Sequence, residues 1–204
     1  ETNTGWQEVG GTLSGDVNWP NSARIAVTNT LTIPAGSTLT VGEAAIVRLS
    51  PGADIIVNGR LMVEGKIDFS TDTAWPVSFV ASQRDRPWGG FIVRGSGAQV
   101  TARGAFFTGS GANPRWFDEN SGYDVHRSEQ ALFLIDGGRV ELTDCYAFDG
   151  HGQFGHGKNG FLTLTRCLVR KFITGGEYNG GSVRIDQSAL IEFPADDEVF
   201  DDAD

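Results

Sequence analysis

Apolar and polar residues alternate over short stretches of the chain, which is the pattern of half-buried β-strands. The clearest stretches are VELT at 140–143 and LTLT at 162–165, each followed two residues later by a cysteine. No segment sustains an apolar stripe at helical spacing, and β-branched residues, aromatic residues and glycine are frequent. The pattern therefore predicts an all-β protein.

A repeated phrase organises the second half of the chain. Four segments align from the glycines at positions 97, 138, 160 and 181, which are 41, 22 and 21 residues apart. A β-sandwich needs no fixed period, whereas a solenoid stacks equivalent residues on successive coils about 4.8 Å apart. Seven residues after each glycine stand the members of one expected structural ladder: Gly104, Cys145, Cys167 and Ser188. We expect both thiols to face inward and to be reduced, with a disulfide as the open alternative.

The period and the strand pattern resemble those of the right-handed parallel β-helix proteins of the pectate-lyase-like family, over residues 24–195. A second resemblance rests on EQALFLIDGG at 129–138, GGEYNGG at 175–181 and SALIEFPADD at 188–197. These segments are similar to β-helical parts of large secreted bacterial proteins that also carry spore-coat-kinase-like or lamin-tail-like modules. The resemblance implies a right-handed parallel β-helix with coils of about 22 residues, in a secreted or cell-surface bacterial protein.

We expect a single module over residues 1–204. Residues 1–23 are expected to form an irregular first coil or N-terminal cap, residues 108–130 a long loop insertion, and residues 192–204 an acidic edge. A first residue other than methionine is expected of a processed or excised chain, and the acidic end has few apolar residues with which to cap a solenoid core. We therefore expect the native protein to continue past Asp204, or a second copy to complete the solenoid.

The charge balance narrows the partners. Sixteen basic residues against 26 acidic ones give a formal charge of −10, which repels nucleic acid and anionic lipid. No run of 18 apolar residues is present, so membrane insertion is not expected. A polysaccharide or a cell-surface glycan is the partner that we expect.

The loops that follow the four repeats should leave the coils on one flank, because they share a register. Aromatic rings cover the apolar faces of sugars, while charged and amide groups bond to the hydroxyls. The candidate glycan-binding residues in these loops are Trp116, Tyr123, His126, Arg127, His151, His156 and Tyr178. Two alternatives stay open: Trp116 and Phe117 could fold the long loop onto the coil as a satellite core, and the three histidines could be plain loop donors or zinc ligands.

The same flank offers candidates for catalysis. Inverting glycosidases place two carboxylates roughly 6.5–9.5 Å apart, and β-helix lyases pair a basic residue with a cation that neutralises a uronate. The candidate catalytic residues are Lys158, Glu177 and Asp149, and the candidate calcium ligands are Asp196, Asp197, Asp201 and Asp202. A solvated acidic tail is the alternative for the last group, and no other cofactor is expected.

The sequence lacks a recognisable lyase motif and is shorter than the enzymes it resembles. We therefore expect an extracellular module without catalytic activity that binds polysaccharide or acts as a rigid surface or spacer element. The alternatives are a polysaccharide lyase or glycoside hydrolase, or an inactive relative, acting on an acidic glycan through the loop flank, and a purely structural fragment.

Overall fold

The computed structural model describes residues 5–68, 70–123, 125–127 and 129–193. Eighteen strands form one large sheet in which neighbouring strands are parallel, and β8 (Lys66–Asp68) and β9 (Thr73–Trp75) form a separate antiparallel hairpin. Within the described residues the helical elements are α1 (Trp116–Asn120) and the 3₁₀ turn η1 (Ser121–Tyr123). The prediction of an all-β protein is confirmed.

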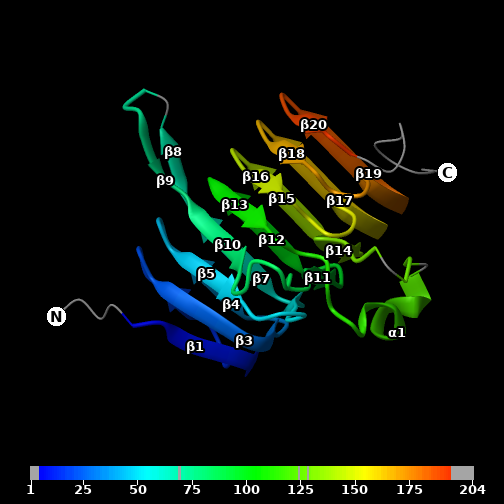
Figure 1. Cartoon of the computed structure of the whole chain (residues 1–204), viewed down its shortest axis with the longest axis horizontal. Helices are drawn as coiled ribbons and strands as arrows, with labels where there is room; N and C mark the ends of the chain where they lie inside the picture. Colours follow the sequence, from blue (N-terminus) through cyan, green and yellow to red (C-terminus); the bar gives the residue numbers. More distant parts are fainter. Residues whose placement is uncertain (1–4, 69, 124, 128, 194–204) are drawn as a thin grey trace.

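The parallel strands pair in three stacks, and successive strands of a stack come from successive circuits of the chain (Figure 1). The first stack contains the start of β3 (Arg24–Ile33), β5 (Ile46–Leu49), β10 (Val77–Ala81), β13 (Ala105–Thr108), β16 (Tyr146–Phe148), β18 (Leu168–Arg170) and β20 (Ala189–Ile191). The second contains the end of β3, β6 (Ile55–Val57), β11 (Phe91–Arg94), β14 (Phe133–Asp136) and the first parts of β17 (Gly155–Thr165) and β19 (Gly176–Asp186).

The third stack contains β2 (Val17–Trp19), β4 (Thr38–Val41), β7 (Arg60–Glu64), β12 (Gln99–Arg103), β15 (Arg139–Thr143) and the second parts of β17 and β19. Strand β1 (Gln7–Thr12) pairs along β3, so β1 and β2 occupy the segment expected to be a first coil or cap. Val140 pairs with Leu162, and Leu162 with Val183. This topology is compatible with a β-helix solenoid.

The core lies between the stacks and is filled by the inward-facing member of each alternating pair. Its centre is a column of fully buried rings in edge and stacked contact, with centroids 5.1–5.8 Å apart: Phe79, Trp88, Phe91, Phe107, Phe133, Phe154 and Phe172. Aromatic pairs at such distances stabilise a core beyond the area they bury. These rings therefore hold the three stacks together.

Residues with positive φ mark the corners between stacks. At the corner before the first stack, φ is 49–60° in Ser22, Ala44, Gly104, Asp144, Arg166 and Gln187. The N–H of Asp144 donates to Thr165 O at 3.0 Å, and the Arg166 guanidinium makes two hydrogen bonds to the Asp144 carboxylate, at 2.7 and 2.9 Å. Each corner is thus a one-residue left-handed turn, and from Ser22 to Arg166 its N–H donates to the carbonyl oxygen of the residue just before the equivalent position on the next row.

The cysteine ladder is present, with one correction. Leu168 N donates to Cys145 O at 3.0 Å and Ala189 N to Cys167 O at 2.9 Å, so Cys145, Cys167 and Ser188 are stacked; both cysteines are free and buried. Phe106, however, pairs with Tyr146. Ala105 therefore lies level with Cys145, and Gly104 belongs to the corner position beside Asp144.

Two segments project from the stacks. The insertion at 108–130 carries α1 and packs on the second stack, while the β8–β9 hairpin extends beyond the strand edges in Figure 1. None of the described helices has the length and apolar character needed to cross a membrane. Asp196, Asp197, Asp201 and Asp202 lie outside the described residues.

Candidate functional site

Three of the predicted side chains meet on the outer side of the second stack. His156 on β17 pairs with Glu177 on β19, so both side chains leave the sheet in the same direction. Glu177 Oε2 lies 3.3 Å from His126 Nε2 and 4.0 Å from His156 Nδ1. We call His126, His156 and Glu177 the histidine–glutamate cluster. The sequence predicts His156 and Glu177 in loops, whereas the structure places them on strands β17 and β19.

The two histidines of the cluster differ in environment. The side chain of His126 is 51% exposed and that of His156 only 3%. His156 Nε2 lies 2.8 Å from the carbonyl oxygen of Tyr123, which can only accept, so Nε2 carries a proton and Nδ1 faces Glu177. The Glu177 carboxylate is therefore placed between an exposed imidazole and a buried one.

The predicted catalytic residues do not assemble into one site. Lys158 lies two positions after His156 on β17, and hence on the same side of the sheet as Glu177. Asp149 instead occupies a corner after the first stack, with a φ of 53°, and its carboxylate lies 3.8 Å from Lys171 Nζ. Among the described residues, no hydrogen bond or ion pair joins Asp149 to Lys158 or Glu177. The arrangement places two candidates together and the third apart.

The aromatic residues of the flank are engaged in packing. Trp116 is 2% exposed, and its Nε1 donates to His126 O at 2.9 Å. It packs with Val125 and with Ile92 and Leu134, which are outward-facing apolar residues of β11 and β14. The structure therefore shows the satellite core that the sequence left open as an alternative, and Trp116 presents no ring to solvent.

The remaining aromatic candidates are also covered. Tyr178 is 6% exposed and belongs to the main core, where burial raises its pKa. The Arg94 guanidinium lies 4.8 Å from the centre of the Tyr123 ring, and that of Arg127 lies 4.2 Å from the centre of the Phe117 ring. Both rings are also partly buried against the satellite core around Trp116, so neither presents a flat exposed surface to a sugar.

A buried carboxylate that the sequence analysis missed anchors the long loop. Asp54 is 1% exposed and accepts hydrogen bonds from Gly90 N at 2.9 Å, Gln130 Nε2 at 2.9 Å and Asn113 Nδ2 at 2.6 Å. Asn113 and Gln130 lie near the two ends of the insertion. Burial raises the pKa of Asp54 to about 6, despite the three donors and with a contribution from the charge of Glu119. An aspartate inside the apolar run ADIIV was the available signal.

No group of histidine, cysteine or acidic side chains within the described ranges is arranged to hold a metal ion. His151 is exposed at a bend of the chain, where its backbone N–H donates to the backbone oxygen of Ser110 at 2.8 Å. Among described residues it makes no hydrogen bond to the other two histidines. The zinc alternative therefore has no assembled ligand set.

The outer side of the third stack, which we call the exposed sheet face, carries a regular array that the sequence analysis did not single out. Two of its rows run across successive strands: Arg60, Gln99, Arg139, Phe161 and Ser182, and beside them Met62, Thr101, Glu141, Thr163 and Arg184. Met62 and Phe161 are 39% and 38% exposed, and the Arg139 guanidinium lies 4.9 Å from the Phe161 ring centre. Neighbouring members of a row are about 4.8 Å apart.

Comparisons of the chain with protein-family models, with curated proteins and with solved structures found no match. The site is therefore interpreted from its own geometry.

Proposed function

We propose that this chain is a noncatalytic, extracellular parallel β-helix module, with coils of about 22 residues, that binds polysaccharide on its exposed sheet face. The observation that carries the proposal is the regular array of donors, acceptors and exposed apolar groups on that face. A secreted or cell-surface bacterial protein would present such a module to glycans of a wall or matrix.

The array suits an extended polymer. A polysaccharide presents hydroxyl groups at a repeating interval, and stacked strands repeat side chains at their own fixed interval. Arginine, glutamine and threonine side chains donate to hydroxyls, while Phe161 and Met62 offer apolar surface to the faces of sugar rings. The described part of the insertion at 108–130 packs on the second stack, which leaves room for a polymer along the face.

The absence of catalysis is proposed because Asp149 lies apart from the other two candidates, Glu177 and Lys158. Asp149 faces Lys171, and Glu177 is shared between two histidines. The second candidate function is a polysaccharide lyase or hydrolase that uses the loop flank. The histidine–glutamate cluster and its neighbour Lys158 favour it, because a carboxylate, imidazoles and an amine on one face could exchange protons with a substrate.

The test is binding to a panel of soluble polysaccharides by isothermal titration calorimetry, together with an assay for new reducing ends and for the absorbance of unsaturated uronates. Phe161→Ala should weaken binding about three- to tenfold, which is the effect of losing one aromatic contact. Ile46→Ala is the matched control, because Ile46 is also 38% exposed but lies on β5, outside the face.

Equal loss of affinity in both variants, or no binding in the panel, would overturn the proposed function. Turnover that disappears in Glu177→Gln would replace it with the enzymatic alternative.

A further inference from the structure

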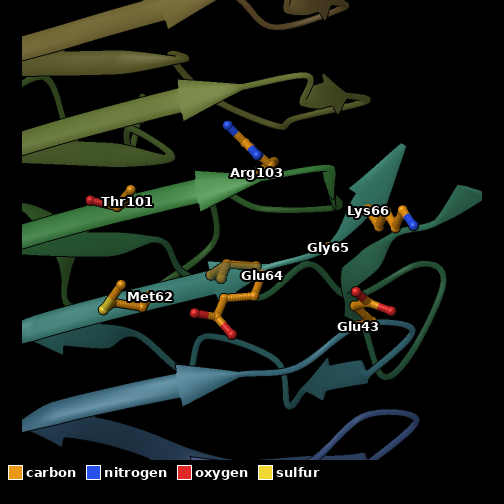
Figure 2. A pocket seen from close by; sticks show the side chains of 8 residues that line it. Glu43, Met62, Glu64, Gly65, Lys66, Thr101 and Arg103 are labelled. Atoms are coloured by element: carbon orange, nitrogen blue, oxygen red, sulfur yellow. The ribbon is translucent and has the colours of Figure 1, made fainter. Parts of the chain in front are cut away.

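A hollow of about 610 Å³ lies where the exposed sheet face meets the β8–β9 hairpin (Figure 2). Its size falls within the range of about 300–1,000 Å³ found for small-molecule sites. The side chains that could contact a ligand in the hollow come from the exposed sheet face, the hairpin and the corner before β5: Glu43, Met62, Glu64, Lys66, Thr101 and Arg103.

The hollow is surrounded by two acidic and two basic side chains that, among the described residues, form no ion pairs with one another. In Figure 2 Arg103 lies above Glu64, and Lys66 lies above Glu43 beside the hairpin. Within the described part of the chain, none of these four side chains forms an ion pair. Two acceptor groups and two donor groups therefore remain available to a ligand.

An exposed tryptophan, Trp75, does not itself line the hollow but is the strand partner of Lys66, which does. Trp75 is 52% exposed, more than any other large hydrophobic residue that the structure describes. It pairs directly with Lys66 across the antiparallel hairpin, so both side chains lie on the same side, with Cβ atoms about 4.5–5.5 Å apart. Ala44 N donates to Trp75 O at 3.2 Å, which fixes the end of the hairpin next to Glu43.

The other described tryptophans have partners in the fold. Trp19, Trp88 and Trp116 are buried, and the Arg48 guanidinium lies 3.9 Å from the ring of Trp6. A large exposed indole gains little from folding, whereas it would gain from covering the apolar face of a ligand. This contrast sets Trp75 apart.

We propose that the hollow binds one neutral sugar unit, with Trp75 stacked on the apolar face of the ring. Glu43 and Glu64 accept hydrogen bonds from sugar hydroxyls, while Lys66 and Arg103 donate to them. The balanced charge selects a neutral sugar, because a uronate would bring its carboxylate near two others and an amino sugar would meet two cations. The inference rests on the proposed function, since Met62 and Thr101 belong to both surfaces and the bound unit would be part of the polymer on the face.

The experiment titrates the full chain with three hexasaccharides: a neutral glucan, a uronate oligomer and a chitosan oligomer. Calorimetry gives the dissociation constants for the wild type, Trp75→Ala, Trp75→Phe and Phe161→Ala. We expect the neutral oligomer to bind tightest, Trp75→Ala to weaken it about tenfold, and Trp75→Phe to retain most of the affinity. The neutral oligomer should also shield tryptophan fluorescence from acrylamide in the wild type.

The outcomes separate the two proposals. Weakening by Phe161→Ala with unchanged affinity in Trp75→Ala overturns the sugar site and leaves the exposed sheet face standing. The reverse result overturns the face and leaves the hollow. Tighter binding of either charged oligomer overturns the neutral class, and a wild type that binds none of the three overturns this inference. Unchanged thermal unfolding of Trp75→Ala, expected for so exposed a residue, shows that any loss of affinity is local.

Discussion

Replacing Asp54 with asparagine should remove a pH dependence of stability that runs opposite to that of most carboxylates. Asp54 is buried beneath the long insertion, and desolvation outweighs its three hydrogen-bond donors, so that its pKa is raised to about 6 from 3.8. A group whose pKa is higher in the folded state binds a proton more tightly there. The stability it contributes is complete below about pH 3.8 and is lost as the pH rises through about 6.

The magnitude follows from the shift. One pKa unit corresponds to about 1.4 kcal/mol, so a shift of about two units corresponds to about 3 kcal/mol of unfolding free energy. Such an amount is a sizeable fraction of the stability of a typical domain, about 5–15 kcal/mol. The term should therefore stand out above the contributions of exposed acids.

The assay is urea denaturation of the wild type and of Asp54→Asn at half-unit steps between pH 3.5 and 7.5. The difference between the two unfolding free energies cancels carboxylates common to both. It should move in favour of the variant as the pH rises, by about 3 kcal/mol, and level off above about pH 6.5. Asp68→Asn is the control: hydrogen bonds from Ser70 lower the pKa of Asp68, so its pH dependence should have the opposite sign. A difference that is independent of pH, or that favours the wild type at higher pH, would refute the reasoning.

Three further outcomes can be measured on the same protein. Gly176→Ala should lower the free energy of unfolding by about 3 kcal/mol or more, because φ is +123° and the added Cβ would lie 1.8 Å from a carbonyl oxygen of the neighbouring strand. Gly122→Ala is the control in the same urea denaturation and should leave that free energy unchanged, because the space around Gly122 is open. Phe91→Ala should cost about 3–5 kcal/mol by removing the ring that four others contact, and a fall of only a few tenths would contradict the aromatic column. A thiol reagent should modify neither Cys145 nor Cys167 in the folded protein and should modify both after unfolding, because both side chains are buried. A hydrogen bond with Cys167, together with burial, also raises the pKa of Cys145. Absence of any reactive thiol in denaturant would indicate a disulfide.

The strand register of the second half could be predicted because it repeats in the sequence. Residues such as Val140 and Leu162 sit in equivalent contexts, and alternation fixes which of them faces inward. The wrong prediction at Gly104 has a physical origin, since a glycine in a repeat can be either a small inward residue or a left-handed corner residue. Its φ of +56° places it with Asp144, at a corner where left-handed geometry selects the residue. An alignment of the repeats that matches the corner residues Gly104 and Asp144 places Ala105 level with Cys145.

The flank was harder to predict because composition alone does not tell whether a loop tryptophan faces water. The deciding signal lies in the strands beneath it. Strands β11 and β14 begin FIV and FLI, with no polar residue at the outward position, and such runs occur where both sides of a sheet are covered. Ile92 and Leu134 need a cover, and Trp116 with the rest of the insertion supplies it. The outward positions of a strand thus decide whether a neighbouring loop forms a packing layer or a binding surface.

The hollow next to the β8–β9 hairpin depends on a local interruption of the regular strand stacking. Val77 lies level with Ala105, so Pro76 precedes the first stack at the place where the other rows put a left-handed residue. Proline fixes φ near −65° and has no N–H to donate to the next row. This row therefore cannot turn in one residue as Gly104 does, and the chain detours through the β8–β9 hairpin between β7 and β10. The detour raises a wall beside the exposed sheet face, which is why charged residues from four segments of the chain surround one hollow there and not at the regular corners.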